Sequence, residues 1–77
     1  MGRGAAGDVS WLVKRSFTLA GHRTSIALES EFWEALDSIA AAQARSLVNL
    51  ISEIDSDRSA DRPLASMLRV HALRRER

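Results

Sequence analysis

The residues best suited to recognition chemistry alternate along the stretch His22–Glu29. Every second side chain is basic or small, and these residues are Arg23, Ser25 and Ala27. The side chains between them are mostly apolar, and these are Thr24, Ile26 and Leu28. Because a β-strand sends successive side chains to opposite faces, the stretch predicts a strand with one apolar face. The other face would present a guanidinium, a hydroxyl and a methyl group to a partner.

A strand needs a partner for its backbone, because unpaired N–H and C=O groups form a template for pairing with another chain. We predict that the partner is the same strand of a second copy, paired edge to edge over Thr24–Leu28. A hairpin within the chain is also possible. The segment from Ser16 to Leu19 alternates as well, and Ala20-Gly21 could reverse the chain because glycine tolerates a positive φ.

The remaining polar residues do not form a catalytic or metal-binding pattern. The 77 residues include two histidines and no cysteine, which is a poor set for a metal site. No nucleophile elbow, phosphate loop or metal-ligand spacing is present. We therefore predict a protein that is not an enzyme and uses no cofactor or metal. His22 is predicted to lie in a surface turn, and His71 to be partly buried and hydrogen-bonded.

Capped helices are predicted after the strand. Ser30 is a good N-cap, and apolar residues at helical spacing then continue to about Ala44. Ser46 is a second N-cap, and its helix ends near Ser56, where a polar linker over residues 56–61 begins. Pro63 suits the first turn of a third helix that extends to about residue 75.

Composition and charge limit the class of protein. Residues 1–28 hold four bases and one acid, residues 29–61 two bases and eight acids, and residues 62–77 five bases and one acid. No apolar run approaches the ~20 residues that cross a bilayer, and no secretory signal is visible, so we expect a cytoplasmic protein. A chain below roughly 80 residues often gains stability by oligomerisation. We assign residues 1–13 to a flexible arm and residues 14–77 to one domain.

The order of strand, capped helix, short turn and capped helix resembles that of a known family. The match rests on Gly21–Glu29, on Phe32, Trp33 and Leu36, and on Ser46, Leu47, Leu50, Ile51, Glu53, Ile54 and Asp55. The chain resembles the ribbon-helix-helix family of DNA-binding proteins, the Arc/MetJ-like family. It is most similar to a bacterial subfamily of small single-domain proteins, in which a base precedes a first strand and a short third helix follows. The resemblance covers residues 14 to about 74.

This resemblance implies a mainly α-helical, intertwined homodimer with a two-stranded antiparallel sheet between its subunits. The ribbon would enter the major groove of double-stranded DNA, and the protein would be a sequence-specific transcription regulator. Base contacts are implied for Arg23, Ser25 and Ala27. Phosphate contacts are implied for Lys14, Arg15, Ser46, Leu47 and Val48, the last three at the start of the second helix. The dimer core would consist of Ile26, Leu28, Phe32, Trp33, Leu36, Leu50, Ile51 and Ile54.

Three residues depart from the family pattern. Ala44 stands where the subfamily commonly has glycine, so we expect the first helix not to end with the low-cost left-handed cap. Val48 replaces a polar residue near the phosphate contact, and Ala27 replaces an outward basic or polar residue. These departures keep a second hypothesis open. In it, the dimer is a protein-interaction module or an antitoxin without strong DNA binding, and the C-terminal helix binds a protein partner.

Several of these side chains also have simpler interpretations. Arg23 could keep a strand edge soluble, and Lys14 and Arg15 could be solvated. Phe32 and Trp33 are predicted to pack in the core rather than to stack on bases. Trp11 either covers the dimer or offers a partner an aromatic anchor.

Overall fold

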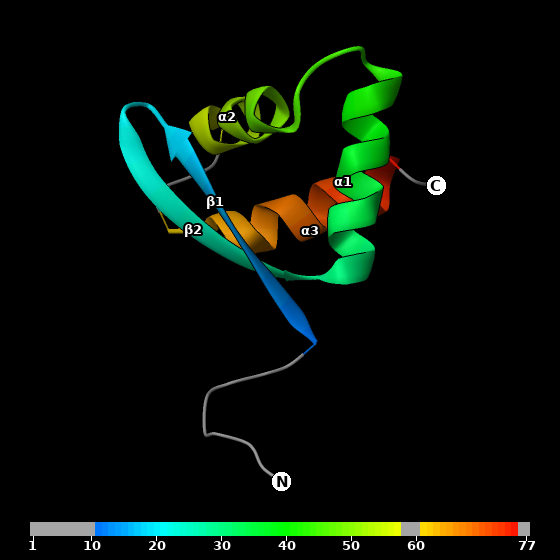
Figure 1. Cartoon of the computed structure of the whole chain (residues 1–77), viewed down its shortest axis with the longest axis horizontal. Coiled ribbons are helices and arrows are strands. Elements are labelled where there is room, and N and C mark those ends of the chain that lie inside the picture. Colours follow the sequence, from blue (N-terminus) through cyan, green and yellow to red (C-terminus); the bar gives the residue numbers. More distant parts are fainter. Residues whose placement is uncertain (1–10, 58–60, 76–77) are drawn as a thin grey trace, which may run out of the picture.

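The structure is a computed structural model that describes residues 11–57 and 61–75. Its elements are β1 (Leu12–Leu19), β2 (His22–Glu29), α1 (Ser30–Ala42), α2 (Leu47–Asp57) and α3 (Leu64–Arg75). The two strands form one antiparallel hairpin, and the three helices pack together beside it (Figure 1). Residues 1–10 of the predicted N-terminal arm and residues 58–60 of the predicted polar linker lie outside the described residues. No helix in the described ranges is long and apolar enough to span a membrane.

A two-residue turn closes the hairpin. Leu19 pairs with His22, and the residues between them, Ala20 and Gly21, have φ angles of 52° and 81°. A type I′ turn requires a positive φ at both central positions, and its twist matches the twist of the paired strands. Glycine adopts this conformation freely, whereas Ala20 carries a Cβ that disfavours it. The hairpin within the chain, which the sequence indicated as a possibility, is therefore confirmed.

The two-stranded sheet forms within one chain, whereas the sequence predicted pairing between two chains. Pairing extends from Leu12 opposite Glu29 to Leu19 opposite His22. β1 begins at Leu12, four residues before Ser16, where the predicted strand-like alternation of side chains begins. Lys14 and Arg15 therefore lie inside the strand rather than before it. A two-residue loop loses little entropy on closure, which favours this local pairing.

One apolar core joins the inner face of the hairpin to the helices. Of the eight residues predicted for a dimer core, all except Phe32 are buried inside a single chain, and Phe32 packs against them half-buried. Helix α3 makes this possible, because Leu68 and Ala72 are buried in the same core. The structure thus buries within one chain the side chains that were predicted to lie between two. Leu64, Ala65 and Met67 of α3 pack half-buried against the same core.

The start of α1 corrects the prediction that Ser30 is an N-cap. Glu29 occupies the N-cap position with φ −59° and ψ 146°, and no side chain caps the helix there. Ser30 is already helical, and its Oγ lies 3.5 Å from Glu31 Oε1. The reason is that β2 continues directly into the helix. Glu29 instead accepts a hydrogen bond from Arg69 Nε of α3 at 2.9 Å, and the Arg69 guanidinium also lies 5.8 Å from the Phe32 ring.

The end of α1 corrects the expectation about Ala44. The helix ends at Ala42, and Ala44 adopts a left-handed conformation with φ 54°. Arg45 N–H donates to Ala40 O at 3.0 Å, and Ala44 N–H donates to Ala41 O at 3.0 Å. These are the two bonds of a Schellman motif. The left-handed cap therefore forms without glycine, because its two bonds satisfy carbonyls that the helix end would otherwise leave open.

The observed starts of α2 and α3 agree more closely with the predicted starts. Ser46 caps α2 as predicted, since Asn49 N–H donates to Ser46 Oγ at 3.1 Å. Pro63 lies one position earlier than predicted, because its carbonyl accepts the first helical bond of α3 from Met67 N–H at 3.2 Å. Such a shift of one residue leaves the direction of α3 unchanged.

We predict that Ala44→Gly stabilises the fold. The substitution removes the steric conflict of a Cβ at positive φ, which is worth about 1–2 kcal/mol, and loses part of this through the greater freedom of glycine in the unfolded chain. The expected net gain in unfolding free energy is about 0.5–1 kcal/mol in urea denaturation. Ala41→Gly is the matched control, since glycine inside a helix costs about 1 kcal/mol. A loss of stability in Ala44→Gly would contradict the cap geometry.

Candidate nucleic-acid interface

The outward side chains of both strands form one exposed surface, which we call the outer face. The cross-strand register places Lys14 opposite Ala27, Ser16 opposite Ser25, and Thr18 opposite Arg23. All six side chains are exposed except Ala27, which is half-buried. The three predicted base contacts therefore lie together, and Lys14 joins them from β1. Ser16 and Thr18 were not among the predicted contacts, because the sequence alone did not fix the register.

Side-chain hydrogen bonds across the strands order this outer face. Arg23 Nη1 donates to Thr18 Oγ1 at 3.3 Å, and the hydroxyls of Ser16 and Ser25 lie 3.2 Å apart. Cross-strand pairs of this kind hold side chains in register on a pleated surface. The guanidinium of Arg23 and the hydroxyls bonded across the strands therefore form one row of hydrogen-bonding groups on the outer face.

The outer face is also positively charged. Its unpaired ionisable groups are Lys14 and Arg23, because Glu29, which has the same parity at the end of β2, forms an ion pair with Arg69 of α3. The acids of α1 and α2 belong to helices that pack with the inner face (Figure 1). Those acids are Glu31, Glu34, Asp37, Glu53, Asp55 and Asp57. The small net charge of the chain therefore conceals a surface that suits an anionic partner.

The backbone at the far edge of β2 is available for pairing. In an antiparallel pair, residues alternate between positions bonded to the partner strand and positions bonded away from it. The pair that flanks the two-residue turn is a bonded pair, so Arg23, Ser25 and Ala27 direct their N–H and C=O groups away from β1. Within the described ranges, the backbone hydrogen bonds outside regular elements involve none of these three residues.

The structure separates Lys14 from its neighbour Arg15. Arg15 lies on the inner face, where its guanidinium carbon is 4.7 Å from the centre of the Trp33 ring and its Nη1 is 3.3 Å from Asp37 Oδ1. Trp33 in turn donates its indole N–H to Val13 O at 2.7 Å, and its ring lies 5.8 Å from that of Phe17. Arg15 therefore ties β1 to α1 and does not join the outer face.

The start of α2, which includes Ser46, Leu47 and Val48, follows the loop after α1 (Figure 1). Ser46 Oγ is already engaged as the cap. Val48 is exposed and offers no side-chain donor.

Arg45 is a residue of this region that reasoning from the sequence missed. Its guanidinium donates to Asn49 O at 3.2 Å, to the Asn49 side chain and to Gln43 Oε1, and it forms an ion pair with Glu53. The sequence signal for this pairing was Arg45 directly before the N-cap Ser46, with the acid Glu53 about two helical turns further along α2. Its charge is already paired in this fold.

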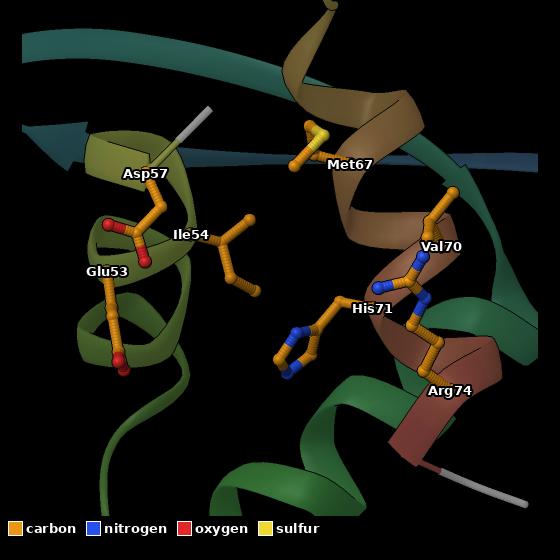
Figure 2. Close-up of a pocket in the computed structure, with 7 residues that line it drawn as sticks. All are labelled: Glu53, Ile54, Asp57, Met67, Val70, His71 and Arg74. Carbon is orange, nitrogen blue, oxygen red and sulfur yellow. The ribbon is translucent and has the colours of Figure 1, made fainter. Parts of the chain in front are cut away.

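A small cavity between α2 and α3 lies apart from the outer face. It has a volume of about 190 Å³ and is lined by Glu53, Ile54, Asp57, Met67, Val70, His71 and Arg74 (Figure 2). His71 is partly buried as predicted, but its Nε2 is buried without a hydrogen-bond partner among the described residues, which corrects the expected hydrogen bond. Burial lowers the pKa of His71, and repulsion from Arg75 lowers this pKa further.

Comparison with known proteins identifies the family. A family model described as the ribbon-helix-helix domain matches residues 12–75, a range that begins at the first residue of β1. The chain therefore belongs to the ribbon-helix-helix family, as its sequence suggested.

A solved structure has a similar fold. It is that of an uncharacterized protein from Bordetella pertussis Tohama I, with a TM-score of 0.71 and 29% sequence identity. The match covers 92% of this chain and 62% of that chain, so the present chain spans less than two thirds of the length of that protein. No match was found among curated proteins.

We predict that His71 makes stability depend on pH. The pKa of its imidazole in the folded chain lies below the ordinary value of 6.5. The unfolded chain therefore takes up a proton first as the pH falls, and the unfolding free energy decreases from about pH 6.5 downward. His71→Leu should remove this part of the pH dependence and stabilise the fold by about 1 kcal/mol at pH 7, because it removes an unpaired buried nitrogen.

Chemical denaturation between about pH 5 and pH 8 measures this effect. His22→Gln serves as the control, because it removes the exposed histidine beside the hairpin turn and leaves the cavity intact. The prediction fails if His71→Leu keeps the pH profile of the unmodified chain.

Proposed function

We propose that the chain is a homodimeric, sequence-specific DNA-binding protein that regulates transcription and reads the major groove with its outer face. The observation that carries this proposal is the exposed, ordered and basic row of side chains on the hairpin, backed by membership of the ribbon-helix-helix family. The major groove admits a two-stranded β-ribbon and presents a distinct pattern of donors and acceptors for each base pair.

The free edge of β2 supports pairing with a second copy. Two β2 strands that pair antiparallel would give a four-stranded sheet in the order β1–β2–β2–β1, with both β2 strands at its centre. This pairing would satisfy the outward backbone groups of Arg23, Ser25 and Ala27 in both copies. The central ribbon of such a dimer would display each of these side chains twice, related by a two-fold axis.

The side chains of β2 suit contacts with base edges. Arg23 can donate two hydrogen bonds to O6 and N7 of guanine, which is the commonest specific contact in the major groove. Ser25 can donate or accept a hydrogen bond, and Ala27 can contact the methyl group of thymine. Arg23 is the longest of the three, so we expect it to dominate discrimination between sequences.

We predict that Arg23→Ala weakens binding to an enriched DNA site by roughly 5- to 150-fold, which corresponds to ~1–3 kcal/mol. Arg23→Lys is the matched control. It keeps the charge but loses the planar fork, so it should retain affinity for random DNA and lose preference for the enriched site. Unchanged site affinity of Arg23→Ala at fixed salt would exclude Arg23 as the base reader.

A salt titration tests the proposed function itself. DNA selected from a random pool and unselected DNA are each titrated with the full chain at several salt concentrations. A protein that neutralises phosphates must show a steep negative dependence of log affinity on log salt. A flat or absent response would instead favour the protein-interaction module or antitoxin, for which Trp11, with 64% of its surface exposed, offers an anchor.

Sedimentation equilibrium tests the dimer independently of DNA. We expect a dimer at micromolar concentration, held by the paired β2 edges. Ser25→Pro would remove one outward N–H donor from that edge and should shift the equilibrium toward monomer. A folded monomer throughout this range for the unmodified chain would contradict the dimer.

A further inference from the structure

The cavity between α2 and α3 is lined by side chains that the proposed function does not use (Figure 2). Its floor is largely apolar, since Ile54 is buried and Met67 and Val70 are half-buried. We propose that this cavity binds a small zwitterionic molecule with an apolar body, of which an apolar α-amino acid is the simplest kind. The inference goes beyond the proposed function, because it concerns a ligand other than DNA and a site away from the outer face.

The rim of the cavity carries charges of opposite sign. Glu53 and Asp57 of α2 face Arg74 of α3 across it, and all three are exposed (Figure 2). Glu53 forms an ion pair with Arg45, but the ion pairs of the described residues include neither Asp57 nor Arg74. Asp57 can therefore accept hydrogen bonds from an ammonium group, and Arg74 can donate to a carboxylate. A ligand with only one charge would leave one side of the rim unmatched.

The imidazole of His71 adds a polar group beside the apolar floor. Its Nε2 is buried and has no hydrogen-bond partner among the described residues. Buried polar groups in folded proteins are nearly always hydrogen-bonded, so this nitrogen calls for a partner that the described chain does not supply. Burial lowers the pKa of His71, so the ring is neutral at pH 7 and can accept a hydrogen bond from an ammonium group. Rotation about the soft χ2 torsion can turn the ring toward a ligand.

The volume of the cavity limits the size of the ligand. The cavity has a volume of about 190 Å³. An apolar cavity of about 150 Å³ binds benzene, so this one admits a molecule slightly larger than a benzene ring. Leucine has a suitable size, with its alkyl part over the floor and its charged groups at the rim. A metal ion is a poorer match, because no group of three or more metal-ligating side chains occurs among the described residues.

A chemical-shift titration of the full chain with leucine, in the absence of DNA, tests the inference. Valine and phenylalanine serve as a smaller and a larger probe. Isocaproate lacks the ammonium group of leucine, and isoamylamine lacks its carboxylate. We expect leucine to bind at least about tenfold more tightly than either analogue, because each analogue loses one charge-assisted hydrogen bond.

Single variants assign the two charges of the ligand to the two sides of the rim. Arg74→Gln should weaken leucine binding by about tenfold and should not weaken isoamylamine binding. Asp57→Asn should weaken leucine binding to a similar extent and should not weaken isocaproate binding. Arg75→Gln is the matched control, since it removes the same charge from the next position of α3, outside the cavity lining, and should keep the affinity of the unmodified chain.

His71→Leu tests the buried nitrogen while keeping an apolar side chain of similar size in the floor. This variant is expected to fold, and it should weaken leucine binding by about fivefold or more. Equal affinities for leucine and isocaproate, or for leucine and isoamylamine, would overturn the inference. Unchanged leucine affinity in Arg74→Gln would do the same, as would the absence of shifts with all three amino acids up to about 10 mM. These readouts involve no DNA, so their failure leaves the proposed function standing.

Discussion

The register of the β1–β2 hairpin is the constraint on which the rest of the molecule depends. Side chains alternate between faces with a period of two, so a slip of one residue would transfer every side chain to the opposite face. The turn at Ala20 and Gly21 fixes the register by pairing Leu19 with His22. The same register places Ile26 and Leu28 in the core. It also directs the backbone groups of Arg23, Ser25 and Ala27 to the free edge of β2.

The hairpin is attached to the helices by contacts of different kinds. Trp33 packs in the core, donates to the backbone of β1 and lies beneath the Arg15 guanidinium. At the other end of β2, the pair of Glu29 and Arg69 joins the strand to α3. A hydrogen bond with its own backbone and the bond from Arg69 lower the pKa of Glu29. These contacts hold the inner face, so the outer face remains available.

Helix α3 changes what a second copy must provide. Leu68 and Ala72 are buried in the core of a single chain. The core side chains of α1 and α2 are therefore covered within one chain. The two-stranded sheet leaves an unpaired backbone edge on each strand, and at the edge of β2 an additional strand would contribute hydrogen bonds rather than a new core. Association through this edge would place charged and hydroxyl side chains, not apolar ones, at the centre of the assembled outer face.

At two alanines the surrounding structure overrides the preference of alanine for a negative φ angle. Ala20 and Ala44 both have positive φ angles, 52° and 54°, in a region where a Cβ costs about 1–2 kcal/mol. At Ala20 the paired strands impose the turn, and at Ala44 two backbone hydrogen bonds impose the cap. The absence of glycine at position 44 made the cap hard to foresee, whereas Gly21 indicated the turn beside Ala20. The strain is tolerated because each turn is held by contacts on both sides of it.

The sequence by itself determined the order of β2 and the three helices, the Ser46 cap and the parity that separates Arg23 and Ser25 from Ile26 and Leu28. These features are local, since they follow from spacing along one strand or one helix turn. Tertiary structure decided which strand pairs with β2, on which face Lys14 and Arg15 lie, and whether the core closes within one chain. Those outcomes depend on cross-strand register and on contacts between residues distant in sequence, such as Arg69 with Glu29 and Trp33 with Val13. Periodicity alone carries no information about such contacts.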